Sequence, residues 1–323
     1  MLAQFLIDRI IKKRREGLSG KILTKIFFML RKIYLWINSS ALIAYNLEGV
    51  DIFLPLRHDL PIVRKYFPYY DSNIGRIAKY LAKKCTNFQA IDIGANVGDT
   101  AIIIKSQLEI PILCIEADDL YFKLLKKNTV SLKNFEYEQS FVGESGTNNF
   151  QLISYKGSAR LTQITDSKNH IEFKSLTEIT GKHSQFNNVK FLKIDTDGFD
   201  CKIIRSNLDY LKLNKPVIFF EYDPHFLSLM GDDGLSVFSS LNEIGYEKLL
   251  IYDNTGVFKM LLNILDQKTL EELHQYYSGR QSEMYMDICA FHRDDSELAD
   301  SFSESEVNLF RNSKIPSNKN SLL

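Results

Sequence analysis

The amino-acid sequence predicts an α/β fold with a mostly parallel, Rossmann-like sheet and a helical extension at the N-terminus. Residues 90–100 run from an apolar stretch through two spaced glycines into a second apolar stretch, which indicates a buried strand, a tight turn and a helix. Apolar strand-like segments and helix-like segments then alternate as far as residue 292. The 323 residues, 45% of them hydrophobic, suffice for one large core with additions.

The elements can be placed in order along the chain. Residues 44–60 suggest a hairpin that turns at Leu47–Gly49, and residues 73–84 suggest a helix. Residues 150–155 are expected to form a strand in an insertion, and residues 157–163 a loop. The expected core strands are 90–93, 112–116, 137–142, 190–195, 216–222, 246–252 and 284–292, with helices at 120–132 and through 203–204.

This pattern divides the chain into four parts. We expect a basic helical extension at 1–43, a hairpin and helix at 44–86, the main domain at 87–293 and a disordered tail at 294–323. The tail is assigned as disordered because it is rich in Ser, Asp, Glu and Asn.

Composition narrows the range of partners. The formal net charge is zero, so no general attraction to nucleic acid is expected. The histidines and cysteines show no metal-ligand spacing, and we expect no metal site. Cys85, Cys114, Cys201 and Cys289 are scattered, which favours free thiols and a cytoplasmic protein.

Charge is concentrated at the N-terminus. Nine Lys or Arg residues face only Asp8 and Glu16 within residues 1–32, between apolar residues at helical spacing. Two basic amphipathic helices could lie on the inner face of an anionic membrane. They could equally cap the main domain or bind a partner protein. Neither apolar run reaches the roughly 18 residues of a membrane span.

The glycine turn indicates which cofactor it holds. A dinucleotide fingerprint needs a middle glycine where this chain has Asn96, and Asp92 precedes the turn. An acid repels phosphate but suits a cationic ligand, and S-adenosylmethionine carries a sulfonium and no phosphate. A plain strand-turn-helix without a ligand is the alternative.

Four of the expected strands end in or near an acidic residue. These acids are Asp92, Glu116, Asp195 and Glu221, and the carboxyl ends of parallel strands are where such sheets bind ligands. Glu116 follows the turn by about twenty residues, the spacing of an acid that accepts a ribose hydroxyl. Pairing of Glu116 with a nearby lysine is the structural alternative.

With these residues in place, the sequence resembles the FkbM family of S-adenosylmethionine-dependent methyltransferases. Three blocks carry the resemblance: residues 91–100, the strand that ends at Glu116, and residues 192–200. It covers roughly residues 88–222, with weaker support to 292. It implies a Rossmann-like methyltransferase sheet, usually of seven strands with the last antiparallel. It also implies methyl transfer to oxygen, often on sugars or other small hydroxyl compounds.

The resemblance assigns cofactor-binding residues one by one. Asp92, Gly94, Asn96 and Gly98 would line the methionine end, together with Asp195. Glu116 would hold the ribose, and the adenine would lie near Val142. Two departures stand out: Ala117 replaces a common proline, and the family's D-x-E-G-x-E is here Asp-Thr-Asp-Gly-Phe-Asp at 195–200, with a shorter reach.

Methyl transfer to a weakly acidic hydroxyl benefits from a positioned base. The resemblance places Asp195 and Asp197 nearest the methyl group. Glu221, Asp223 and His225 end or follow the next strand and could face the same cleft, although His225 could also be an ordinary loop residue. The Asp195–Asp197 pair could alternatively bind a divalent cation, but a third ligand is not evident.

Two other functions remain open at this level. A nicotinamide-dependent oxidoreductase would share the sheet and the ribose acid, although Asn96 breaks its fingerprint. A non-catalytic, membrane-associated partner could keep the fold for assembly alone. The acceptor of the expected enzyme is a small molecule or a glycan: a nucleotide sugar, a lipid-linked glycan and a surface polysaccharide all fit.

Overall fold

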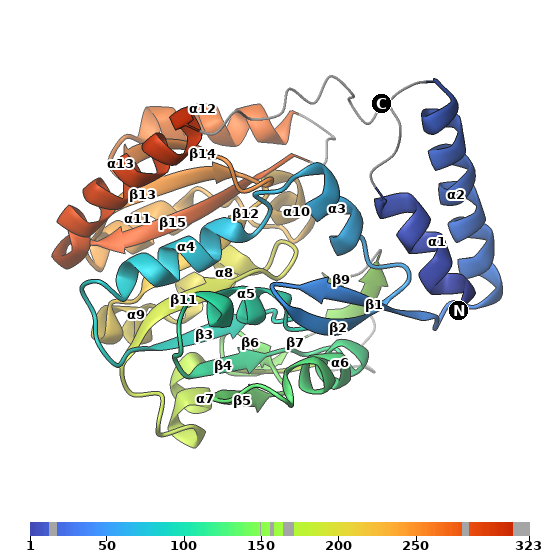
Figure 1. The fold of residues 1–323 in the computed structure, drawn as a ribbon. Helices are drawn as coiled ribbons and strands as arrows, with labels where there is room; N and C mark the ends of the chain where they lie inside the picture. Colours follow the sequence, from blue (N-terminus) through green and yellow to red (C-terminus); the bar gives the residue numbers. More distant parts are fainter. Residues whose placement is uncertain (13–17, 149, 156–157, 164–170, 280–283, 313–323) are drawn as a thin grey trace.

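A computed structural model of the chain shows an α/β fold around one eight-stranded sheet (Figure 1). It describes residues 1–12, 18–148, 150–155, 158–163, 171–279 and 284–312. The strands of the main sheet are β3 (Gln89–Ile93), β4 (Ile112–Ile115), β5 (Phe135–Glu138), β11 (Val189–Ile194), β12 (Val217–Tyr222), β13 (Tyr246–Asp253), β14 (Phe258–Asn263) and β15 (Met286–His292).

The strand order is β14-β13-β15-β12-β11-β3-β4-β5. Strands β5 to β12 pair in parallel, and the last strand, β15, is inserted antiparallel between β12 and β13. The resemblance implied seven strands; β14 is an eighth, added at the edge beside β13. From β3 the chain builds outward first through β4 and β5, then on the other side through β11 and β12. This reversal is a topological switch point, where open α/β sheets bind ligands.

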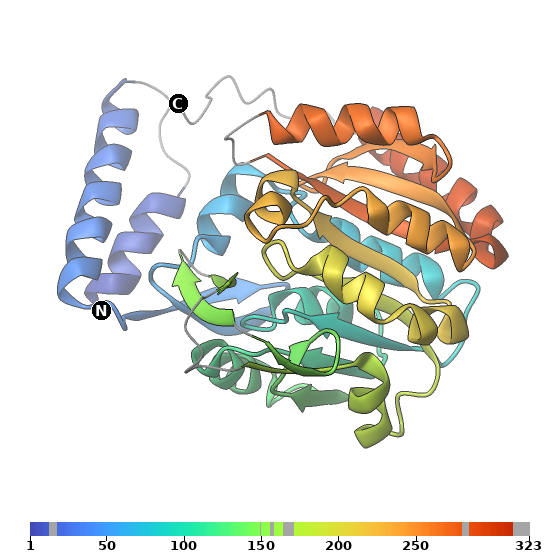
Figure 2. The same ribbon diagram turned by 180° about the vertical axis from the view of Figure 1, so that it is seen from behind.

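Successive side chains of a strand point to opposite faces of the sheet. Both faces are buried because helices pack on each of them. On β12, Val217 and Phe219 pack with α4 (Ser72–Leu81) and α5 (Asp99–Gln107). Ile218 and Phe220 pack on the other face with α8 (Asp200–Ser206) and α11 (Ser236–Glu243). Figure 2 shows that second face, with the yellow and orange helices in front. The remaining helices of the main domain are α6 (Asp119–Thr129), α7 (Leu176–Lys182), α9 (Leu208–Asn214), α10 (Pro224–Leu229) and α12 (Gln267–Ser278).

The N-terminal part forms its own small core against the main domain. Helices α1 (Leu2–Ile11) and α2 (Leu18–Ile37) are followed by the hairpin β1 (Leu42–Leu47) and β2 (Val50–Pro55) and by α3 (Leu60–Tyr66). Apolar side chains of α1 and the hairpin pack with Val97, Ile102 and Tyr121 of the glycine turn, α5 and α6. Residues 56–71 are thereby held over the carboxyl ends of the main-sheet strands.

The inserted region differs from two expectations. Residues 137–142 do not form one strand: β5 ends at Glu138, and β6 (Phe141–Val142) joins β10 (Ile171–Lys174) and β7 (Gly146–Asn148) in a separate sheet. Residues 158–163 form strand β9 (Ser158–Gln163), which pairs with β8 (Phe150–Tyr155), so the expected loop there was wrong. Gly157 lies outside the described residues.

The expectation of a disordered tail was wrong for residues 296–312, which form helix α13 (Ser296–Asn312). Leu298, Ala299 and Phe302 are buried against the α4 side of the sheet. The guanidinium of Arg76 on α4 donates two 2.7 Å hydrogen bonds to Glu306, whose side chain is buried. The apolar positions recur at helical spacing, but Ser, Asp and Glu between them dilute the pattern. Residues 313–323 lie outside the described part.

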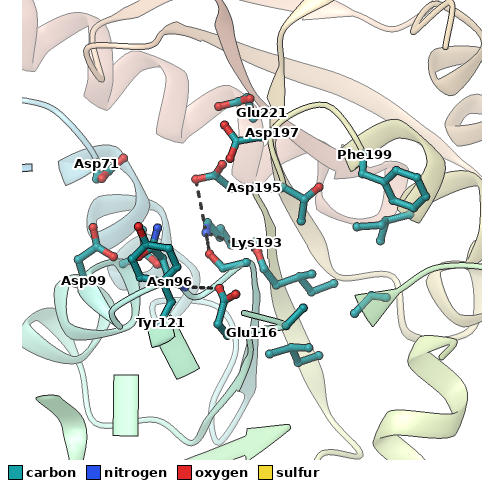
Figure 3. Close-up of a pocket in the computed structure, with 18 of the residues that line it drawn as sticks. Asp71, Asn96, Asp99, Glu116, Tyr121, Lys193, Asp195, Asp197, Phe199 and Glu221 are labelled. Atoms are coloured by element: carbon teal, nitrogen blue, oxygen red, sulfur yellow. Dashed lines mark hydrogen bonds and ion pairs between the residues drawn. The ribbon is translucent and has the colours of Figure 1, made fainter. Parts of the chain in front are cut away.

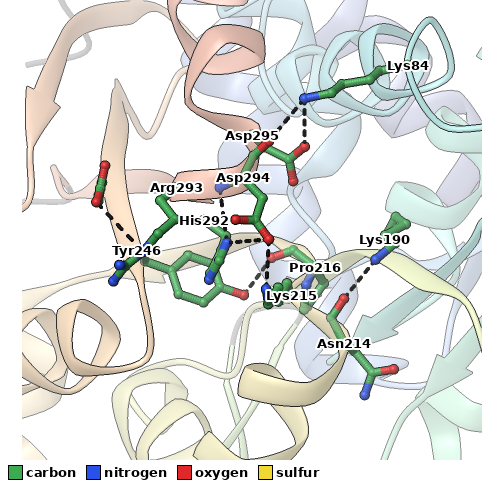
Figure 4. A network of polar contacts seen from close by, with 11 residues as sticks. Lys84, Lys190, Asn214, Lys215, Pro216, Tyr246, His292, Arg293, Asp294 and Asp295 are labelled. Carbon is green, nitrogen blue, oxygen red and sulfur yellow. Dashed lines mark hydrogen bonds and ion pairs between the residues drawn. The ribbon is translucent and has the colours of Figure 1, made fainter.

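A polar network fixes the start of this helix (Figure 4). The turn η1 (Arg293–Asp295) joins β15 to α13. Lys215 forms a 2.7 Å ion pair with Asp294, and Lys84 forms one of 3.2 Å with Asp295. The network ties the C-terminal helix to the segment before β12 and to the end of α4.

Candidate active site

The glycine turn after β3 packs closely on the backbone that follows β11 and on a side chain of α6. Gly94 has φ +71°, and a Cβ there would lie 1.9 Å from the backbone oxygen of Asp195. Gly98 has φ +89° and directly precedes α5, and a Cβ there would lie 2.9 Å from the Leu125 side chain of α6. Only glycine fits both constraints. Gly94 lines a cavity at the carboxyl ends of β3, β4 and β11, whereas Gly98 packs on α6 and does not line it.

Glu116, at the end of β4, lies on one wall of that cavity (Figure 3). Its carboxylate accepts hydrogen bonds of 2.8 Å from the backbone N–H of Asn96 and from that of Asp118. These bonds leave further lone pairs for a ligand hydroxyl. Burial raises the pKa of Glu116 to about 7, against the opposing effect of the two backbone donors.

Asp92 lies beneath the turn rather than in the cavity. Its side chain is fully buried, 3.0 Å from the ammonium of Lys193 on β11, and accepts a 2.5 Å hydrogen bond from Thr100. Lys193 also donates to the backbone oxygen of Gly94 at 3.0 Å. Burial opposes the charge on Lys193, but Asp92 and Asp195 raise its pKa above the ordinary value. Asp92 therefore does not line the cavity, and its link to the cavity runs through Lys193 and the turn.

The block after β11 brings the predicted catalytic carboxyls into the cavity. Asp195 and Asp197 both line it, and Asp195 lies 3.5 Å from Lys193 with its side chain 46% exposed. Asp200 is buried and shapes the loop instead, accepting 3.1 Å hydrogen bonds from the N–H groups of Thr196 and Gly198. Burial raises the pKa of Asp200 to about 7.

Glu221, at the end of β12, also lines the cavity, and one of its carboxyl oxygens differs from those of the other acids that line it. Its side chain is only 7% exposed. Among the described residues, no group hydrogen-bonds to its buried Oε1. Burial raises the pKa of Glu221 well above its ordinary value, and the carboxylates of Asp195 and Asp200 raise it further. Figure 3 shows Glu221 beside Asp197 and Asp195.

Of the other residues predicted from the sequence, some line the cavity and some do not. Val142 lines the cavity from β6. His225 is exposed in the first turn of α10 and does not line it. Asp223 caps that helix, accepting a 2.8 Å hydrogen bond from the N–H of His225. In the part of the chain that the structure describes, no three His, Cys, Asp or Glu residues could together hold a metal ion.

Sequence reasoning missed the wall contributed by residues 56–71. His58, Tyr70 and Asp71 line the cavity, as does Asp99 at the start of α5. Burial lowers the pKa of His58 and raises that of Asp71. His58, Tyr70 and Asp71 follow the hairpin rather than a core strand, so their positions in the sequence do not mark them as strand-end residues.

The residues of the cavity fit S-adenosylmethionine. Glu116 and the N–H of Asn96 stand side by side, as a ribose-binding pair requires. Beyond them the cavity turns apolar, as an adenine needs, with Ile115, Val142, Phe173 and Phe199. Towards the glycine turn it is lined by the carboxyls of Asp99 and Asp195, which suit the positive ammonium and sulfonium groups.

The affinity for S-adenosylhomocysteine, the demethylated cofactor, is expected to depend on the pH through Glu116. If Glu116 binds the ribose as predicted, a ribose hydroxyl would donate to the ionised carboxylate, and protonation below a pKa of about 7 would oppose binding. Kd measured by calorimetry should rise about tenfold from pH 8 to pH 6. Glu116→Gln should weaken binding about tenfold at pH 8 and flatten the pH dependence. Glu272→Gln, at an exposed position on α12, should behave like the wild type. An unchanged pH dependence in Glu116→Gln would show that another group titrates.

Comparisons with known proteins found a family model and solved structures that are similar to this chain. The family model described as "Methyltransferase FkbM domain" matches residues 92–248. A comparison with curated proteins found no match. Solved structures with similarity include a precorrin-6y C5,15-methyltransferase from Geobacter metallireducens GS-15, with 11% identity over 67% of this chain and 86% of that one and a TM-score of 0.36. The METTL16 MTase domain has 13% identity over 81% and 79%, with a TM-score of 0.40. The N-methyltransferase NodS from Bradyrhizobium japonicum WM9 has 6% identity over 68% of this chain and 93% of that one, with a TM-score of 0.36.

By the family model, the chain carries a methyltransferase FkbM domain at residues 92–248, and it is a methyltransferase whose cofactor is S-adenosylmethionine.

Proposed function

We propose that this methyltransferase methylates a hydroxyl oxygen of a sugar in a glycan or glycolipid precursor. The support comes from the acids that share one end of the cavity. Asp195, Asp197 and Glu221 all line it and come from the carboxyl ends of two neighbouring strands. Carboxylates accept hydrogen bonds from hydroxyl groups, and sugars present several hydroxyls to bind.

The unpartnered Oε1 of Glu221 is the observation that carries the proposal. Leaving a buried polar oxygen without a hydrogen bond costs free energy, and such a group at a cavity wall marks a place where a ligand is bound. A sugar hydroxyl donating to this oxygen would satisfy it.

The same contact positions a base for the reaction. When bound, S-adenosylmethionine would supply the methyl group, whose bond to the positively charged sulfur breaks so that S-adenosylhomocysteine leaves. The Glu221 carboxylate accepts the hydroxyl proton as the acceptor oxygen gains the methyl group, and Asp195 and Asp197 hold the sugar beside it. Because burial raises the pKa of Glu221, its carboxylate is a stronger base than an exposed one.

The proposal is tested by incubating the protein with S-adenosylmethionine carrying a labelled methyl group and with a panel of nucleotide sugars, lipid-linked glycans and polysaccharide extracts. Mass spectrometry should find the label as an ether on a sugar oxygen. Asp195→Asn should lower its yield at least tenfold, and the exposed Glu272→Gln should not.

Label on nitrogen or carbon would contradict methylation of a hydroxyl. Saturable binding of S-adenosylhomocysteine without transfer to any acceptor class would favour a non-catalytic partner that retains the fold. Binding of NAD in place of S-adenosylhomocysteine would favour the oxidoreductase alternative.

A further inference from the structure

Helix α2 presents an apolar face away from the protein. Ile22, Ile26, Met29, Ile33, Trp36 and Ile37 form this outer face, with exposed fractions of 40–88%. At about 100° per residue, all six fall within an arc of about 100°. Both ribbon views show α2 as the outermost element on its side of the molecule (Figure 1, Figure 2). A contiguous exposed apolar face of this kind marks an interaction site.

The charges beside the outer face indicate what it contacts. Lys21, Lys25 and Lys32 are exposed and fall together along one edge of the face. The sequence of α2 contains no Asp or Glu. An apolar stripe with lysines at its edge complements a bilayer with anionic headgroups, because the stripe enters the acyl boundary while the lysines meet the phosphates. Two copies of the chain packed through this face would bring lysines towards a partner helix without acids.

The opposite side of α2 anchors it beside the cavity. Arg31 is buried, donating a 2.9 Å hydrogen bond to the backbone oxygen of Leu56 and pairing with Asp59 at 2.7 Å. Phe27 contacts Phe5 of α1 with ring centroids 6.0 Å apart. Asp59 also lines the cavity. The inner side is therefore used for packing on the cavity rim, and the outer face is left for another surface.

We propose that α2 lies in the plane of an anionic bilayer surface and holds the cavity next to it. None of the described helices is long and apolar enough to cross a membrane, so the contact is with one leaflet. The helix spans about 30 Å, enough to lay the whole outer face on the bilayer. The proposal does not depend on which acceptor the enzyme uses.

The only tryptophan of the chain, Trp36, reports on this contact directly. The full-length protein is mixed with vesicles of phosphatidylcholine alone or with about 30% phosphatidylglycerol. With the anionic vesicles, Trp36 fluorescence should shift to the blue and be quenched by brominated acyl chains, and the protein should sediment with the vesicles. Neutral vesicles should bind at least tenfold more weakly, since three lysines lose their anionic partners.

Two variants separate the apolar and the charged contributions. Ile26→Ser/Ile33→Ser should weaken binding to anionic vesicles at least thirtyfold, because two isoleucines that would enter the bilayer are lost. Lys21→Gln/Lys25→Gln/Lys32→Gln should bind both kinds of vesicle with similarly low affinity. The control is Leu213→Ser/Leu265→Ser, which changes two exposed leucines outside α2, and it should bind like the wild type. S-adenosylhomocysteine affinity should be unchanged in all three, which shows that they fold.

The proposal is overturned if the wild type binds neither vesicle, or if the control weakens binding as much as Ile26→Ser/Ile33→Ser. It is also overturned if light scattering shows a dimer that Ile26→Ser/Ile33→Ser dissociates while vesicle binding is unchanged, since a second copy would then cover the face. Because vesicle binding is measured without methyl transfer, a failure here and a failure of the proposed function can be told apart.

Discussion

Lys193→Met is expected to destabilise the fold by about 3–5 kcal/mol, because it leaves the buried charge of Asp92 without its partner. Both side chains are at most 2% exposed and lie 3.0 Å apart under the glycine turn. The ammonium also holds the backbone oxygen of Gly94. Urea unfolding should show a lower midpoint, and calorimetry should show weaker binding of S-adenosylhomocysteine, since the turn loses its support.

The double variant Lys193→Met/Asp92→Asn is the matched control. It removes both charges, so much of the lost stability should return even though the cofactor loop is still altered. If the single and double variants are equally unstable, the cost lies in the packing of the lysine stem rather than in the unpaired Asp92. Asp92 would then have no electrostatic role beneath the turn.

The parts of the fold that the sequence could predict are those where one local pattern decides the structure. Ile91, Ile93 and the glycines that follow fix a buried strand and a turn because few other structures accept both. Glu116 could be placed at the cavity because it ends a parallel strand at the spacing of a ribose acid. Asp195 and Asp197 follow the same argument on β11.

The remaining parts depend on contacts that local patterns do not contain. Helix α13 is stabilised by Phe302 in a distant core and by the pairing of Glu306 with Arg76, which lies 230 residues away in the sequence. His58 and Asp71 reach the cavity because the N-terminal core holds their segment over the sheet. The burial of Asp92 and the exposure of His225 also depend on how neighbouring elements pack.

The Glu221→Gln variant is expected to lower kcat for methyl transfer by about 10²- to 10⁴-fold, the range of a lost general base. Glutamine keeps the size and the hydrogen-bonding capacity of the side chain but cannot accept the hydroxyl proton. Glu221 must be ionised to act, so kcat of the wild type should rise with pH up to its raised pKa. The variant should lose this dependence. Its affinity for S-adenosylhomocysteine should stay close to that of the wild type, because the residue predicted to bind the ribose is Glu116 and not Glu221.

Two further variants distinguish Glu221 from its neighbours in the cavity. Asp197→Asn changes the carboxyl drawn beside it (Figure 3), and if Asp197 only positions the acceptor, KM should rise more than kcat falls and the pH dependence should remain. His58→Gln changes another titratable side chain that lines the cavity. If His58→Gln removes the pH dependence of kcat while Glu221→Gln keeps it, the base lies on the wall formed by residues 56–71. The unpartnered oxygen of Glu221 would then bind the acceptor without taking its proton.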